Sequence, residues 1–158
     1  MTAKILFVVS MHRSGSSLLA KGLECFGAEL GDRLMPPAKD NPKGFFEDLD
    51  IVALNDEILN VSDYQWTLTS QEPRSLPTSL EVQYLEKAKA LINSKIKDNN
   101  VKNFFIIKDP RLCRVLPLWV KACEQLNISF KTIFITRDFN DVATSLINRN
   151  DISFEGGY

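Results

Sequence analysis

The sequence of 158 residues contains few of the residues that build metal sites and disulfide frameworks, with three cysteines and one histidine. An odd number of cysteines, without the close spacing of metal ligands, predicts neither a disulfide network nor a zinc site. We therefore expect no bound metal. We also expect three buried, reduced thiols of the kind found in the cytoplasm, at Cys25, Cys113 and Cys123.

Neither an excess of one charge nor a long apolar run is present. The net charge of −1 argues against a broad surface for nucleic acid or for an anionic membrane. No apolar run approaches the length of a transmembrane helix, and the run at residues 5–9 is too short for the core of a signal peptide. We therefore predict a cytoplasmic protein that binds neither nucleic acid nor membrane.

The chain instead alternates between strand and helix patterns, as one α/β domain does. Apolar runs rich in β-branched and aromatic residues predict three buried strands, at residues 5–9, 103–108 and 130–135. Helical spacing predicts five helices, near residues 16–26, 48–60, 78–96 and 112–126 and from 141 onward. Gly27 is expected to end the first helix, and Thr78 with Glu81 to form a capping box on the third. This alternation predicts a parallel sheet flanked by helices in a single domain, residues 1–158.

The polar loop between the first strand and the first helix has the composition of a phosphate-binding site. The unpaired N–H groups of a helix N-terminus, together with the helix dipole, favour an anion. Gly15 allows a close approach of the backbone, and Arg13 adds a fork of donors suited to an oxyanion. Hydroxyl donors come from Ser14, Ser16 and Ser17. The alternative is an ordinary turn in which the serines occur by chance.

The same loop departs from the nucleoside-triphosphate motif G-x-x-x-x-G-K-[ST]. Ser10 and Gly15 take the two glycine positions, but Ser16 stands where the lysine belongs. The loop therefore keeps the frame of a phosphate binder without the lysine that serves Mg-nucleoside triphosphate chemistry. Its R-S-G-S-S segment resembles the 5′-phosphosulfate loop of the sulfotransferases, in the R-S-G-[ST]-[ST] form of Golgi and bacterial members.

A second anion site is predicted where the last strand ends. Arg137 follows the carboxyl end of that strand, at the edge where open α/β sheets bind ligands. Arg137 and Ser145 lie in R-D-x-x-D-V-x-x-S, which resembles the sulfotransferase pattern R-x-P-x-D-V-x-x-S, with Phe139 in place of the proline. In that family the arginine and the serine clamp the 3′-phosphate of the donor. The alternative is a surface arginine and a helix serine that face solvent.

Lys108 ends the middle strand and begins the segment K-D-P-R. This segment resembles one in tyrosylprotein sulfotransferases, whose lysine contacts the sulfonate side of the donor. For Asp109 and Pro110 we favour helix capping and a first-turn proline. For Lys108 we favour the functional interpretation over an ammonium group that extends to solvent from a capped helix.

Glu47 ends the segment N-P-K-G-F-F-E, residues 41–47, which resembles a segment of bacterial sulfotransferase-like chains. In tyrosylprotein sulfotransferases a glutamate downstream of the phosphosulfate loop accepts the proton of the acceptor hydroxyl, and Glu47 is the candidate for that role. The alternative is that Glu47 and Asp48 are first-turn acids favoured by the helix dipole.

Four motifs in order, between residues 5 and 147, carry the resemblance, and it implies the sulfotransferase type of P-loop fold, a three-layer sandwich. It implies transfer of a sulfonate group from 3′-phosphoadenosine-5′-phosphosulfate (PAPS) to a hydroxyl or an amine, with adenosine 3′,5′-bisphosphate (PAP) as product and no metal. The implied catalytic residues are Arg13, Glu47 and Lys108. The implied donor-binding residues are Arg13, Ser14, Gly15, Ser16, Ser17, Arg137 and Ser145.

The acceptor stays open among carbohydrate, lipid, small alcohol and protein tyrosine. Candidates for the wall of its pocket are Tyr64, Trp66, Phe45 and Phe46, although core packing is the safer interpretation of the two phenylalanines. His12 adjoins the loop and could hydrogen-bond the donor, but a lone histidine beside a cation is more often structural. Two other functions stay open: a P-loop kinase for a nucleoside or small metabolite, and a non-catalytic nucleotide-binding module. The glycine-rich C-terminal segment of the family is not found, so we interpret the chain as either a minimal or a truncated member.

Overall fold

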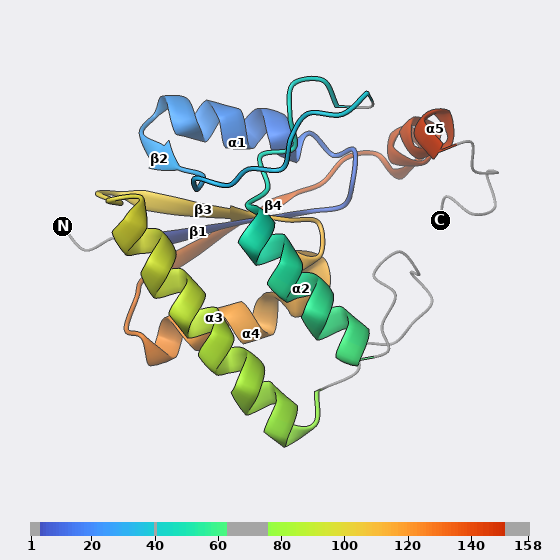
Figure 1. Cartoon of the computed structure of the whole chain (residues 1–158). Helices are drawn as coiled ribbons and strands as arrows, with labels where there is room; N and C mark the ends of the chain where they lie inside the picture. The colour runs from blue at the N-terminus through green and yellow to red at the C-terminus, as the bar shows by residue number, and fades with distance from the viewer. Residues whose placement is uncertain (1–3, 40, 63–75, 151–158) are drawn as a thin grey trace.

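A parallel sheet of four strands forms the middle layer of the computed structural model, which confirms the predicted α/β class (Figure 1). The structure describes residues 4–39, 41–62 and 76–150, so Tyr64 and Trp66 lie outside the described residues. The strand order is β2–β3–β1–β4, with β1 at Lys4–Ser10, β2 at Ala28–Glu29, β3 at Phe104–Lys108 and β4 at Phe130–Ile135. The sequence did not predict β2, because two residues are too few to show a strand pattern.

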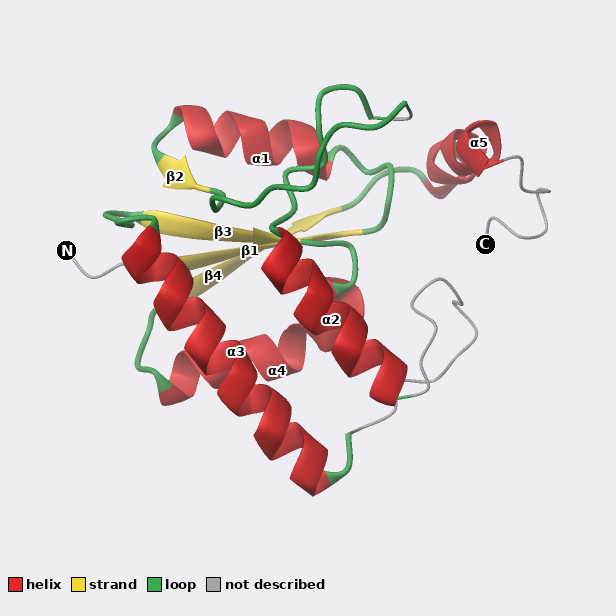
Figure 2. Ribbon diagram, in the orientation of Figure 1, coloured by secondary structure: helices red, strands yellow, loops and turns green. Residues whose placement is uncertain are grey.

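Helices cover both faces of this sheet. One face is covered by α1 (Ser16–Cys25), and the other by α2 (Leu49–Val61), α3 (Thr78–Asp98) and α4 (Leu112–Gln125) (Figure 1). The remaining helix, α5 (Phe139–Asn150), follows β4 beyond its carboxyl end. Figure 2 shows the long loop that connects β2 to α2. The carboxyl ends of β1, β3 and β4 lie at one edge of the sheet, since the strands are parallel.

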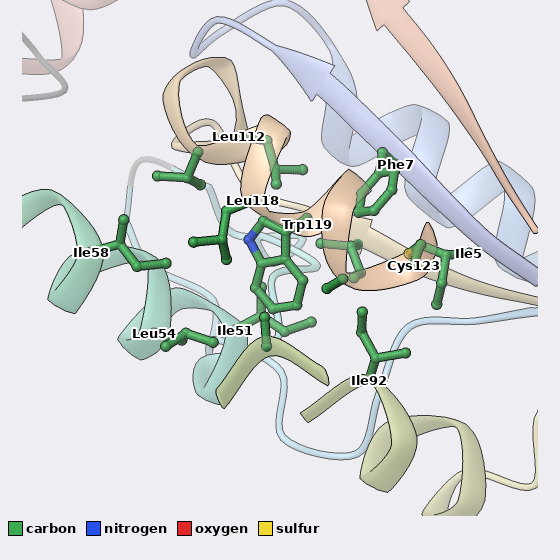
Figure 3. Close-up of a cluster of buried hydrophobic side chains, with 14 of the residues drawn as sticks. Ile5, Phe7, Ile51, Leu54, Ile58, Ile92, Leu112, Leu118, Trp119 and Cys123 are labelled. Carbon is green, nitrogen blue, oxygen red and sulfur yellow. The ribbon is translucent and has the colours of Figure 1, made fainter. Parts of the chain in front are cut away.

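The central strand β1 is buried on both faces, as its continuous apolar pattern indicates. Successive side chains of a strand point to opposite faces. Ile5 and Phe7 therefore join the larger core beneath α2, α3 and α4, whereas Leu6 and Val8 join a smaller core beneath α1. Trp119 of α4 is fully buried in the larger core, among side chains of the facing helices (Figure 3).

The structure corrects the predicted N-terminal cap of α3 and confirms the predicted end of α1. The capping box of Thr78 and Glu81 is wrong: Pro77 is the N-cap of α3, Thr78 is its first helical residue, and no side chain caps the helix. Thr78 already lies inside the helix, so its side chain is not at the cap position, and the Pro77 carbonyl oxygen accepts from the Glu81 N–H at 2.9 Å. Glu81 instead forms an ion pair with Lys121 of α4 at 2.6 Å. The expected end of α1 is confirmed, because Gly27 has a left-handed φ of 82° just after the helix.

The expectation of three buried thiols is correct for Cys123 alone, since Cys25 and Cys113 are exposed. Cys25 is the last residue of α1, and Cys113 is the second residue of α4, where its Sγ donates a hydrogen bond to the carbonyl oxygen of Ser10 at 3.4 Å. The number and spacing of cysteines do not determine which face of a helix each one occupies. Within the described residues, no helix combines the length and the apolar character needed to cross a membrane.

Candidate functional site

A cavity of about 470 Å³ lies at the carboxyl edge of the sheet. Its wall comes from the loop after β1 and the first turns of α1, from the end of β3, from Arg137 after β4, and from residues 41–47 of the loop before α2. Open parallel sheets bind ligands at this edge, and ligand pockets usually measure about 300–1,000 Å³. The cavity therefore has the place and the size of a site for a small molecule.

The loop after β1 enters α1 through two residues in the left-handed conformation. Arg13 has a φ of 63° and Gly15 a φ of 91°, and Gly15 is the N-cap of α1 without a side-chain cap. A left-handed arginine is uncommon, and such conformations cluster at functional loops. Gly15, Ser16 and Ser17 line the cavity, so the N-terminus of α1 faces it. Helix N-termini attract anions through their N–H groups and dipole.

Ser14 was predicted to bind the donor together with its neighbours. Ser14 is buried, and the described residues that line the cavity include neither Ser14 nor Ser145. His12 lines the cavity, where both of its predicted roles stay open.

The structure brings the two predicted anion sites into direct contact. The Arg13 Nε donates a hydrogen bond to the Ser145 Oγ at 2.8 Å, and the Arg137 Nη1 donates to the carbonyl oxygen of Arg13 at 3.0 Å. Arg137 also faces Asp141, with 3.4 Å between Nε and Oδ2. The alternative in which Ser145 faces solvent is wrong, because its hydroxyl accepts from Arg13 in the loop after β1. The other half of that alternative, a surface arginine, holds, since Arg137 is exposed.

Lys108 and Glu47 form a buried ion pair in the cavity wall. The Lys108 Nζ lies 2.5 Å from the Glu47 Oε1 and also donates to the carbonyl oxygen of Phe45 at 2.9 Å. The two side chains are 4% and 7% exposed, so Lys108 does not extend to solvent. Burial raises the pKa of Glu47 above its ordinary value, and the Lys108 ammonium opposes part of this rise. Such a carboxylate is a better proton acceptor than an exposed one.

The position of Glu47 excludes the first-turn alternative. Asp48 is the N-cap of α2, and its carboxylate accepts hydrogen bonds from the N–H groups of Asp50 and Ile51. Glu47 precedes this cap, so it lies outside the helix and is directed to Lys108 instead. Asp48 is thus a capping acid, whereas Glu47 belongs to the cavity.

The segment 41–47 is fixed by hydrogen bonds to its own backbone and to α1. The Asn41 Nδ2 donates to the carbonyl oxygen of Gly44 at 2.7 Å, and the Ser17 Oγ donates to that of Phe45 at 3.3 Å. Phe46 packs against the smaller core, as expected, while both phenylalanines also line the cavity.

Sequence reasoning missed three polar residues of the cavity wall, namely Asn41, Lys21 and Lys43. The signal for Lys21 is its helical spacing, since it follows Ser17 by four residues and shares its face of α1. Asn41 and Lys43 lie in the segment N-P-K-G-F-F-E, in which a catalytic role was predicted for Glu47 alone.

Asp109, predicted as a helix cap, serves a larger network. α4 begins at Leu112 without a side-chain cap, while the Asp109 Oδ1 accepts from the Arg111 N–H at 2.9 Å in the turn before it. The Asp109 Oδ2 accepts from the Asn55 Nδ2 at 2.8 Å, and the Asn55 Oδ1 accepts from the Trp119 Nε1 at 2.8 Å. This buried chain of hydrogen bonds joins α2 to α4 directly behind Lys108.

Comparisons of the chain with family models, with curated proteins and with solved structures find no match. In the described part of the chain, no group of three or more histidine, cysteine, aspartate or glutamate side chains is placed to hold a metal ion.

Proposed function

We propose that the protein is a sulfotransferase with the sulfotransferase type of P-loop fold, which transfers a sulfonate group from PAPS to a hydroxyl or amine of an acceptor. One observation carries the proposal. Three strand ends bring Arg13, Lys108 and Arg137 to one cavity, together with the buried carboxylate of Glu47. These are the side chains that the sequence resemblance assigns to the two anions of such a donor and to its acceptor.

Donor binding uses the two loops that meet at Arg13. The N-terminus of α1, with Gly15, Ser16 and Ser17, would hold the 5′-phosphosulfate. Arg137 and Ser145 would hold the 3′-phosphate, and both already contact Arg13. A donor held at both ends loses little further freedom on the way to the transition state, which favours transfer.

The chemical step uses the ion pair of Glu47 and Lys108. The donor supplies the sulfonate group, whose bond to the 5′-phosphate oxygen breaks as a bond from sulfur to the acceptor oxygen or nitrogen forms. Glu47 accepts the proton that the acceptor loses. Lys108 and Arg13 stabilise the negative charge that develops on the phosphate oxygen. The acceptor proton thus goes to Glu47. The electron pair of the broken bond stays on the 5′-phosphate oxygen, and PAP leaves as the product.

A P-loop kinase is the main competing function. That chemistry uses a lysine directly after the second glycine of the loop, and Ser16 occupies this position. A non-catalytic module of the same fold would bind nucleotide without transferring a group. The buried Glu47, whose pKa is raised by burial, supports an enzyme over such a module.

Titration calorimetry with PAP tests the donor site. We expect Arg13→Ala and Arg137→Ala each to weaken PAP binding by about tenfold to a hundredfold, since a hydrogen bond to a charged group contributes about 1.5–3 kcal/mol. Lys131→Ala removes an exposed cation from β4 and is the charge-matched control, with unchanged affinity. Glu47→Gln should retain PAP binding. Wild-type affinity in both arginine variants, or binding of Mg-ATP in preference to PAP, would reject the donor site.

A further inference from the structure

The loop that carries Glu47 is closed at its base by backbone pairing. The N–H of Met35 donates to the carbonyl oxygen of Glu47 at 2.7 Å, and the N–H of Leu49 donates to that of Arg33 at 2.8 Å. Leu34 and Asp48 form an antiparallel bridge between these two hydrogen bonds. We call the paired segments 31–35 and 47–49 the neck. The neck closes a compact surface loop, a form that often carries functional residues.

One lysine of α3 holds both sides of the neck together. The Lys95 Nζ lies 2.7 Å from the Asp48 Oδ2, 2.7 Å from the Asp50 Oδ2 and 3.0 Å from the Asp32 Oδ1. Asp32 precedes the loop, whereas Asp48 and Asp50 follow it. Lys95 is 4% exposed. Burial alone would lower the pKa of Lys95, but the hydrogen bonds that its ammonium donates to the three carboxylates raise it, so the ammonium stays charged.

The packing at the neck leaves little room for movement. Gly31 has a φ of 100°, and a Cβ at this position would lie 2.3 Å from the Asp48 Oδ2. The same Asp48 carboxylate uses its other oxygen, Oδ1, to cap α2. One side chain therefore ties the loop to Lys95 and to the first turn of α2 at once.

We propose that Lys95 is a positioning residue that sets the place of Glu47 opposite Lys108, by holding Asp32 and Asp48 across the neck. Glu47 adjoins Asp48 in the chain, and its own carbonyl oxygen is part of the neck. A shift of the neck thus moves the Glu47 carboxylate out of its 2.5 Å contact with Lys108. The role of Glu47 as proton acceptor rests on the proposed function, whereas its position does not.

Lys95→Met tests this role, because methionine fills similar space without the charge. Lys87→Met is the matched control, since Lys87 also lies on α3 and pairs with a carboxylate of α2, Glu57, but at an exposed site. In Lys95→Met we expect amide hydrogen exchange at Met35 and Leu49 to accelerate by about tenfold relative to the core strands. The carbon-13 NMR titration of the Glu47 carboxyl group should also shift. Lys87→Met should leave both readouts unchanged.

The double variant Lys95→Met with Asp48→Asn separates positioning from simple stability. Asparagine caps α2 as well as aspartate does and leaves no buried charge without a partner. We expect stability to recover while the exchange at Met35 and Leu49 and the shifted Glu47 titration persist. Recovery of these two readouts along with stability would overturn the proposal, as would unchanged exchange at the neck in Lys95→Met.

PAP calorimetry and PAPS turnover, with 4-nitrophenol as probe acceptor, test whether the position of Glu47 affects catalysis separately from donor binding. Misplaced Glu47 should lower turnover by about a hundredfold, with the affinity for PAP retained. Wild-type protein that fails to bind PAP would reject the sulfotransferase function, yet the exchange and titration results would still decide the role of Lys95. Wild-type turnover in Lys95→Met, with normal PAP binding, would contradict the positioning role itself.

Discussion

Replacement of Lys108 by methionine leaves the Glu47 carboxylate buried in the cavity wall without the ammonium group that now lies 2.5 Å from it. Removal of one partner of a buried ion pair destabilises a protein by about 3–5 kcal/mol when the remaining charge stays ionised. Glu47 can avoid this destabilisation by binding a proton and becoming neutral, because burial already raises its pKa. The loss of stability in Lys108→Met must therefore depend on pH.

The sign of this dependence follows from proton binding. In the folded variant the pKa of Glu47 lies above its value in the unfolded chain, so between these two values the folded state binds more protons. Stability is then fully present below the unfolded pKa and falls as the pH rises toward the folded one. Each pH unit changes the free energy of unfolding by at most about 1.4 kcal/mol, so the change between pH 5 and pH 8 is limited to about 4 kcal/mol.

Urea unfolding at pH 5 and at pH 8 measures two contributions to the loss of stability, the lost hydrogen bond of Lys108 and the unpaired charge of Glu47. At pH 5 we expect Lys108→Met to lose about 1 kcal/mol relative to wild type, because the Phe45 carbonyl oxygen loses the Lys108 donor and keeps the weaker bond from the Ser17 hydroxyl. At pH 8 we expect a loss of about 3–5 kcal/mol. The double variant Lys108→Met with Glu47→Gln has neither charge of this pair, so its loss should be the same at both pH values. Equal losses for the single variant at pH 5 and pH 8 would refute the buried pair.

Two further substitutions test the neck and the network behind Lys108. Gly31→Ala should destabilise the protein by about 2 kcal/mol or more in thermal unfolding, since the new Cβ meets Asp48 at a positive φ. Gly22→Ala, in the open interior of α1, should instead stabilise it by about 0.5–1 kcal/mol, and a loss at Gly22 or none at Gly31 would contradict the backbone geometry. Asn55→Ala should cost about 2–4 kcal/mol, because Trp119 and Asp109 both lose a partner, whereas Asn103→Ala on the surface should stay within about 0.5 kcal/mol of wild type. Chemical denaturation measures the free energy of unfolding of the Asn55 and Asn103 variants. Equal losses of stability in the two would exclude the buried network.

The parts of the site that could be predicted are those that follow strand ends. Lys108 comes directly after an apolar run, and Arg137 and Arg13 follow the ends of two others by two and four residues. Parallel strands bring these carboxyl ends to one edge. The contact between Arg13 and Ser145 follows from this topology, although its hydrogen bond could not be read from the sequence.

The neck could not be predicted, because its contacts join residues far apart in the chain. Lys95 lies three residues after the buried Ile92, on the apolar face of α3, where a lysine is normally expected to reach solvent. Its partners Asp48 and Asp32 lie 47 and 63 residues earlier. Glu47 and Asp48 likewise look alike in sequence, and only the three-dimensional position of the helix cap separates their roles.

Titration calorimetry of the wild-type protein with PAP and with adenosine 5′-monophosphate tests the central claim most directly. The two ligands differ by the 3′-phosphate, which Arg137 and Ser145 are proposed to hold beside Arg13. We predict that PAP binds at least about tenfold more tightly, since a hydrogen bond from a charged donor contributes about 1.5–3 kcal/mol. Equal affinity for the two nucleotides, or no binding of PAP, would contradict a sulfonate-donor site at this cavity.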